Sequence, residues 1–155
     1  MIFLQQIVNS RKAADRETDT LPRIERKEEK HVNVICVEPK LTNLMRLKSQ
    51  VKRLKPDAAV YGCRSPDDAL AVAKAEGCDL LLTEIDLGGG QYDGFLLGEE
   101  FKKLKPRTNI IFVTERMDNQ RAGRALALHA CGYVEKPCAP EALAREFRYL
   151  RYAVE

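Results

Sequence analysis

The sequence predicts an α/β domain in which one parallel sheet of five strands is covered by helices on both faces. Two observations support this prediction. Short apolar runs alternate five times with segments of helical periodicity, and several of these runs contain almost no polar residue. Strict alternation is typical of parallel strands joined by right-handed crossovers. Strands without polar alternation are typical of a sheet buried on both faces.

Each expected strand is an apolar run bounded by polar or turn-forming residues. The first run is closed by Glu38 and Pro39, and the third stays apolar until it reaches Glu84. The expected strands are residues 32–37, 58–63, 79–84, 109–114 and 132–135.

The segments between the strands repeat apolar residues every three or four positions, as amphipathic helices do. The second helix has the clearest boundaries, because Ser65 is a favourable N-cap, Pro66 suits the first helical position and Gly77 suits the end. The expected helices are residues 41–54, 66–76, a third with Leu97, Phe101 and Leu104 on one face, 118–130 and 140–151.

The length of 155 residues fits one domain, but the first 31 residues differ from the rest. Nearly every second residue of 11–30 is charged, so this stretch has too little apolar surface to fold alone. We expect residues 1–31 to be an extension, either disordered or a short helix with Phe3, Leu4, Ile7 and Val8 on one face. The regular pattern places the domain at residues 32–152.

The composition argues against several classes of function. The 26 basic and 23 acidic residues are mixed and give a net charge of only +3, so we expect no direct binding to nucleic acid. The apolar stretch 1–8 is too short to span a bilayer, so no membrane association is expected. The five cysteines form no CxxC pair, which is typical of reduced thiols in a cytoplasmic protein rather than a zinc site.

Polar residues gather where the predicted strands end. Glu38 follows the first strand, Glu84 ends the third and Asp86 lies two residues beyond it, Thr114 ends the fourth and Lys136 follows the fifth. In an open parallel sheet, ligands bind beyond the carboxyl ends of the strands. We therefore expect carboxylates, a hydroxyl and an ammonium group to meet at one edge.

This arrangement resembles the receiver domain of response regulators, the CheY-like family. The resemblance rests on an acid after strand one, an acid ending strand three, a threonine ending strand four and Lys136 followed by Pro137, with Tyr133 three residues before the lysine. The stretches 110–114, 128–133 and 149–152 are similar to receivers of bacterial transcription regulators. The resemblance implies a doubly wound, flavodoxin-like sheet of order 2-1-3-4-5, a place in two-component phosphorelay signalling, and a histidine kinase or an output domain as partner.

The resemblance also implies roles for individual positions. In the family, paired acids after strand one help to bind Mg²⁺, and an aspartate ending strand three accepts the phosphoryl group. The threonine and the lysine then contact the phosphoryl oxygens, which assigns Thr114 and Lys136 to the switch. The aromatic residue on strand five, here Tyr133, changes rotamer. The family also implies a cis peptide bond before Pro137.

The chain departs from the family at the chemical positions. Pro39 stands where the second metal-binding acid would be and offers no side-chain ligand, and Glu84 replaces the accepting aspartate and is longer by about 1.5 Å. Phosphoryl transfer depends on positioning and charge neutralisation, so we expect no useful phosphorylation at Glu84 and at most weak Mg²⁺ binding by Glu38 and Glu84. Glu84 either pairs structurally with Lys136 or partly mimics a phosphoryl group.

The expected function is therefore a phosphorylation-independent signalling module that is not an enzyme and acts by protein contact, as a homodimer through its C-terminal helix–strand–helix face. The alternative is a working phosphoacceptor receiver that controls transcription and uses Glu84 or Asp86. A flavin carrier on the same scaffold is disfavoured, because a flavin phosphate needs small residues with inward amides after strand one, where this chain has Glu38, Pro39 and Lys40.

Overall fold

The structure is a computed structural model that describes residues 31–152. The predicted extension of residues 1–31 lies outside the described residues except for His31. The described part contains a sheet of five parallel strands in the order β2-β1-β3-β4-β5, which is the flavodoxin-like order that the sequence implied. The strands are β1 (Asn33–Val37), β2 (Ala59–Cys63), β3 (Leu80–Thr83), β4 (Asn109–Thr114) and β5 (Gly132–Glu135).

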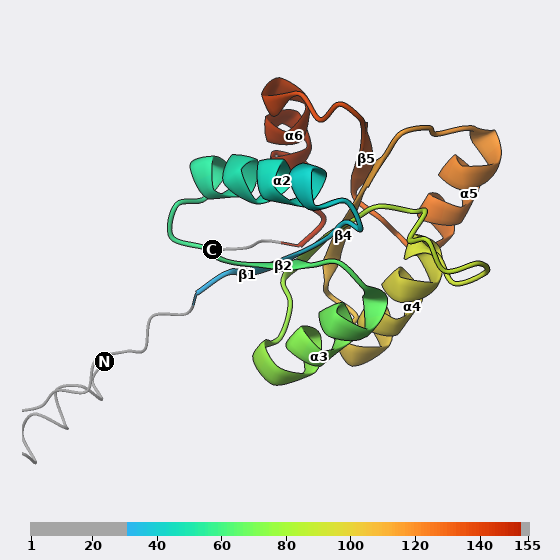
Figure 1. Cartoon of the computed structure of the whole chain (residues 1–155), viewed down its shortest axis with the longest axis horizontal. Coiled ribbons are helices and arrows are strands. Elements are labelled where there is room, and N and C mark those ends of the chain that lie inside the picture. Colours follow the sequence, from blue (N-terminus) through green and yellow to red (C-terminus); the bar gives the residue numbers. More distant parts are fainter. Residues whose placement is uncertain (1–30, 153–155) are drawn as a thin grey trace, which may run out of the picture. The chain divides into compact units, whose positions relative to one another are not determined.

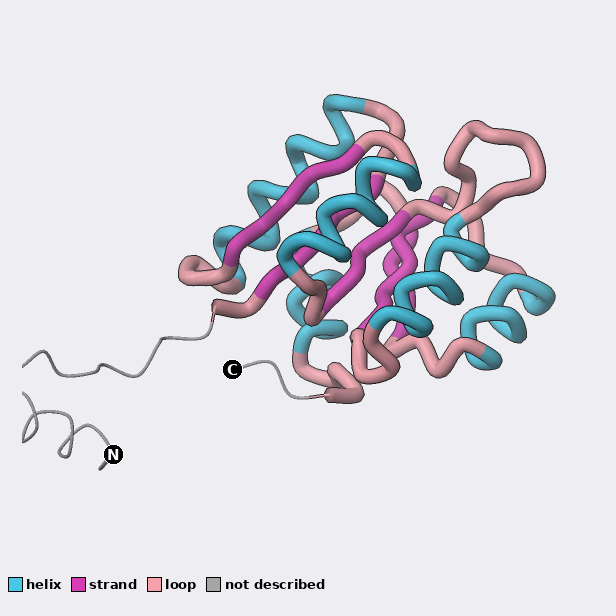
Figure 2. Tube along the Cα trace, turned by 90° about the horizontal axis from the view of Figure 1, so that it is seen from below, coloured by secondary structure: helices cyan, strands magenta, loops and turns pink. Residues whose placement is uncertain are grey.

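Within residues 31–152, five helices cover the two faces of the sheet. They are α2 (Leu41–Leu54), α3 (Pro66–Glu76), α4 (Gly94–Leu104), α5 (Asn119–Ala127) and α6 (Pro140–Phe147). Helices α2 and α6 lie on one face, and α3, α4 and α5 lie on the other (Figure 1). Figure 2 shows the second group in front of the strands. None of the helices in residues 31–152 is long and apolar enough to cross a membrane.

The two layers enclose two apolar cores, one on each face of the sheet. The core under α3, α4 and α5 contains Ile35, Leu81 and Phe112 from the strands, whereas Cys36 and Leu82 point into the core under α2 and α6. Neighbouring strand residues thus face opposite cores. Because both faces are covered, the central strands are apolar throughout, as the sequence predicted.

Helix α5 ends at Ala127, three residues earlier than the sequence predicted. His129 adopts a left-handed conformation with φ +59°, and the Ala130 amide donates to the Ala125 carbonyl at 3.0 Å. This bond closes the helix in the manner of a Schellman motif, in which glycine usually takes the left-handed position. The sequence offered no glycine there, so the boundary could not be predicted.

Helix α6 is also shorter than predicted, and Leu104 does not share the buried face of α4. The α6 helix ends at Phe147, after which the chain turns so that the Tyr152 amide donates to Asn109 Oδ1 at 2.8 Å. Leu104, the last residue of α4, is exposed, while Leu97 and Phe101 are buried as predicted.

The five cysteines are free thiols, and all except Cys131 are buried. Burial raises the pKa of the Cys36 thiol above its ordinary range and that of Cys78 to about 12. Because the thiolate is the reactive form, these two thiols act as packing groups.

Candidate functional site

The ends of three strands bring Glu38, Glu84 and Lys136 together. Lys136 Nζ lies 2.6 Å from Glu38 Oε1 and 2.5 Å from Glu84 Oε1. The three side chains are largely buried, with 13%, 5% and 6% exposed for Lys136, Glu38 and Glu84. We refer to these three residues as the Lys136 cluster. The sequence predicted that Lys136 would meet Glu84, but it did not predict that Glu38 would share the same ammonium group.

The backbone explains why these three side chains meet. The amides of Glu38 and Glu84 continue the parallel ladder one residue beyond their strands, donating to Cys63 O and Val37 O at 3.0 Å each. The Lys136 amide donates to Thr114 O at 2.9 Å. Each residue is therefore held by the neighbouring strand at the carboxyl edge of the sheet, where parallel folds place their sites.

Both carboxylates of the cluster also accept backbone hydrogen bonds. Glu38 Oε2 accepts from the Lys40 amide at 2.9 Å, and Glu84 Oε2 accepts from the amides of Ile85 at 2.6 Å and Asp86 at 3.1 Å. Each of the four carboxylate oxygens thus has a protein partner. Satisfied in this way, a buried ion pair avoids much of the cost of desolvation.

The surroundings of Lys136 favour its charged form. Burial alone would lower the pKa of this amine, but hydrogen bonds and charges from Glu38 and Glu84 outweigh burial and raise the pKa above its usual value of 10.5. Lys136 is therefore an ammonium at neutral pH. Its single positive charge faces two carboxylates.

The same edge offers few oxygens for a divalent cation. Pro39 follows Glu38 and has no side-chain ligand, and its carbonyl accepts from Arg64 Nε at 2.9 Å. Within residues 31–152, no group of three or more histidine, cysteine or acidic residues is arranged to hold a metal ion. Mg²⁺ requires near-ideal octahedral oxygen ligands, and the residues present do not fit that requirement.

Asp86 does not lie on a continuing strand. Strand β3 ends at Thr83, and the Glu84 carboxylate binds the next two amides, so the chain turns away from the sheet. Gly94 packs against this turn so closely that a Cβ there would lie 2.3 Å from the Glu84 carbonyl. The Asp86 side chain points outward, with 69% exposed, and pairs with Arg121 of α5 at 3.1 Å.

The predicted switch residues occupy different surroundings. Thr114 is fully buried at the end of β4, and its Oγ1 accepts from Arg121 Nη1 at 3.4 Å. Tyr133 lies on the edge strand β5 and is exposed. The Lys136–Pro137 peptide is cis, as the family resemblance implied.

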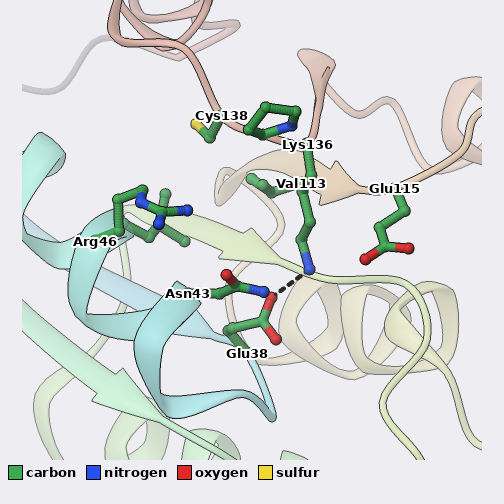
Figure 3. A pocket seen from close by; sticks show the side chains of 9 residues that line it. Glu38, Asn43, Arg46, Val113, Glu115, Lys136 and Cys138 are labelled. Carbon is green, nitrogen blue, oxygen red and sulfur yellow. Dashed lines mark hydrogen bonds and ion pairs between the residues drawn. The ribbon is translucent and has the colours of Figure 1, made fainter.

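A cleft of about 380 Å³ opens beside the Lys136 cluster. Figure 3 shows the Lys136 side chain crossing it towards Glu38, with Arg46 and Glu115 on opposite sides. The lining residues are Glu38, Asn43, Arg46, Leu47, Val113, Glu115, Lys136, Pro137 and Cys138.

Sequence reasoning missed one residue of this edge altogether. Arg121 joins Asp86 and Thr114, although it lies on a surface helix and belongs to none of the strand ends. The only available signal was its place in the first turn after the N-cap Asp118, near the end of β4. That position does not reveal the direction of a long side chain.

Known structures share this fold. A CheY-like receiver domain from Methanospirillum hungatei JF-1 is 22% identical with a TM-score of 0.67, and the match covers 77% of this chain and 92% of that one. The receiver domain of a DNA-binding response regulator from Colwellia psychrerythraea 34H is 19% identical with a TM-score of 0.69, covering 76% and 95%. The receiver domain of a modulated diguanylate cyclase from Desulfovibrio desulfuricans G20 is 26% identical with a TM-score of 0.64, covering 77% and 92%.

Sequence comparison gives the same assignment at the level of the family. No curated protein matches the chain. The family model described as "Response regulator receiver domain" matches residues 20–148, which is most of the chain. With the strand order and the carboxyl-edge site described above, this match shows that the chain belongs to the response regulator receiver domain family, whose members are modules of two-component signal transduction.

Proposed function

We propose that this receiver signals by protein contact without phosphoryl transfer at residue 84. The observation that carries the proposal is the Lys136 cluster, in which the ammonium group is bound by both carboxylates. Glu84 replaces the accepting aspartate, and both of its oxygens are engaged by Lys136 and backbone amides. A nucleophile held in this way would have to give up two kinds of partner before it could attack phosphorus.

Weak or absent Mg²⁺ binding is the second part of the proposal. Glu38 would have to release either Lys136 or the Lys40 amide to become a ligand, and Pro39 cannot contribute a side chain. Without the cation, charge neutralisation for phosphoryl transfer at residue 84 would rest on protein cations such as Lys136, which is already paired with both carboxylates. Positioning and neutralisation supply most of the catalysis in this reaction, so both requirements are weakened together.

Glu84 resembles a phosphoryl group only in part. It carries about one negative charge, against roughly 1.5 to 2 for a phosphorylated side chain. In the cluster, the carboxylates of Glu84 and Glu38 both bind the same ammonium group, that of Lys136. We therefore assign Glu84 primarily to a structural ion pair with Lys136. The Glu84→Gln variant tests whether Glu84 also partly mimics a phosphorylated aspartate.

A phosphorylation assay tests the proposal directly. We expect the wild-type chain, incubated with acetyl phosphate and Mg²⁺, to show no phosphoryl adduct by intact-mass spectrometry and no saturable binding of beryllofluoride. The matched variant Pro39→Asp/Glu84→Asp restores the acids of the family pattern, so we expect it to bind Mg²⁺ more tightly than wild type. A stable adduct on wild-type Glu84 or Asp86 would instead establish the working phosphoacceptor.

We also propose that the chain forms a homodimer through α5, β5 and α6. Leu126 of α5, Tyr133 of β5 and Tyr149 after α6 are all exposed, and β5 is an edge strand of the sheet. Exposed apolar side chains beside an unpaired edge are typical of association surfaces. Partners of this face also include a kinase or an output domain, which the family uses.

Sedimentation velocity across a concentration series tests the dimer. We expect Leu126→Asp/Tyr133→Asp to weaken dimerisation by about tenfold or more, because each change buries a charge at the interface. Met45→Asp is the control, since Met45 is also an exposed apolar residue but lies on α2, outside this face. An effect of the control as large as that of the double variant would refute this interface.

The same measurement tests mimicry by Glu84. If Glu84→Gln has the same oligomeric state as wild type, Glu84 does not mimic a phosphoryl group.

A further inference from the structure

Arg121 links three separate segments at the carboxyl edge of the sheet. It lies in the first turn of α5, and its Nη2 contacts Asp86 Oδ1 and Oδ2 at 3.1 and 3.4 Å. Its Nη1 donates to Thr114 Oγ1 at 3.4 Å and to Arg116 O at 3.0 Å. One guanidinium group therefore connects the loop after β3, the end of β4 and the loop that leads into α5.

The environment of Arg121 is unusual for a helix on the surface. Its side chain is only 21% exposed, although its partner Asp86 is 69% exposed. A planar guanidinium offers five donors in a fixed geometry, so it can serve several acceptors at once. Thr114 is fully buried, so its hydroxyl depends on protein partners, and Arg121 supplies one of them.

We propose that Arg121 is a positioning residue, a built-in cation that holds Thr114, residues 115–118 and the first turn of α5 in one arrangement. The inference rests on the proposed function. The family resemblance assigns the threonine at this position to phosphoryl oxygens, whereas here the hydroxyl is already bound by Arg121. The position of α5 then depends on Arg121 and Asp86, not on a phosphoryl group at residue 84.

The two halves of this link respond differently to salt. The ion pair with Asp86 is exposed on the Asp86 side, so dissolved ions screen it. The hydrogen bonds to Thr114 and to the Arg116 carbonyl use neutral acceptors, and the partly buried guanidinium shields them. Raising the ionic strength should therefore loosen the loop after β3 from α5 without releasing Thr114 completely.

Hydrogen–deuterium exchange of the full chain tests the inference. We expect Arg121→Ala to accelerate amide exchange within residues 114–121 by about tenfold or more, because charge-assisted hydrogen bonds restrain local opening. Arg121→Lys should give a smaller acceleration, since one ammonium keeps the charge but cannot reproduce the fork. The matched control is Arg116→Ala, because the Arg116 side chain is 71% exposed and lies 3.8 Å from its partner Asp118.

A second variant keeps the inference testable if Arg121→Ala loosens the whole domain. Asp86→Ala removes only the ion pair, so we expect a smaller acceleration in the same peptides and loss of their salt dependence. Apolar packing of the Arg121 side chain alone would not produce that loss, because apolar contacts are not screened by dissolved ions. Exchange in Arg121→Ala equal to that in Arg116→Ala would overturn the inference, as would an Asp86→Ala variant that keeps the salt dependence of wild type.

These outcomes are separate from those that test the proposed function. A phosphoryl adduct on the wild-type chain would refute phosphorylation independence, whatever the exchange data show. Unchanged exchange at residues 114–121 in Arg121→Ala would refute the positioning role, even if the wild-type chain takes no phosphoryl group.

Discussion

Replacing Lys136 with methionine is expected to lower the free energy of unfolding by about 3–5 kcal/mol at pH 7, because it leaves buried carboxylates without their counter-charge. Glu38 and Glu84 are almost fully buried, and both rely on this one ammonium group. Methionine keeps most of the aliphatic stem, so the loss reports on the charge rather than on packing. Urea denaturation followed by circular dichroism measures the change.

A charge-free version of the cluster is the control for this substitution. In Glu38→Gln/Lys136→Met/Glu84→Gln no charge is left unpaired, so we expect much of the lost stability to return. If Lys136→Met costs no more than about 0.5 kcal/mol, the usual range of surface substitutions, the ammonium group does not neutralise the buried carboxylates.

The pH dependence of the free energy of unfolding, compared between wild type and Lys136→Met, gives an independent check. The pKa of Lys136 is raised above 10.5 in the folded state, although burial alone would lower it, because Glu38 and Glu84 favour the ammonium form. Its contribution to stability is therefore complete below pH 10.5 and is lost as the pH rises through the folded-state pKa. We expect the difference in stability between wild type and Lys136→Met to be constant near neutral pH and to shrink at alkaline pH.

Phe112→Ala is expected to be about as damaging, with a loss of about 3–5 kcal/mol in the free energy of unfolding. Phe112 is completely buried in β4, and its ring packs on Phe95 of α4 with 4.8 Å between centroids. It lies two residues before Thr114 on the same strand. The cavity would therefore remove contacts that hold α4 and the end of β4, and the loss is measured by urea denaturation.

Leu104→Ala is the control for Phe112→Ala. Leu104 is the last residue of α4 and is exposed, so its truncation removes little buried surface. We expect a cost close to that of ordinary surface changes, about 0.5 kcal/mol. Equal losses for the two variants would contradict the assignment of Phe112 to the core.

The sequence predicted the strands and their ends because strands buried on both faces consist almost entirely of apolar residues. The end of β3 was predicted within one residue, since apolar residues give way to Glu84 at that point. Once the strands were known, the geometry of a parallel sheet placed Glu84 near Lys136, and the structure has these groups 2.5 Å apart.

The ends of helices were harder to predict than the ends of strands. Helix α5 stops at Ala127 because His129 takes a left-handed conformation, which is uncommon for residues other than glycine even though histidine adopts it more often than most. The exposure of Tyr133 was not predicted either, because it follows from β5 lying at the sheet edge. Periodicity describes one segment at a time and contains no information about such neighbours.

The sequence by itself determined the α/β alternation, the family pattern and the identity of the groups that reach the carboxyl edge. Only the tertiary structure decided how those groups are paired: Glu38 and Glu84 share Lys136, while Arg121 takes Asp86 and Thr114. The reason is physical. Strand register fixes where each chain segment ends. A long charged side chain can reach several partners, and which of them it pairs with depends on differences of a few ångströms between segments far apart in sequence.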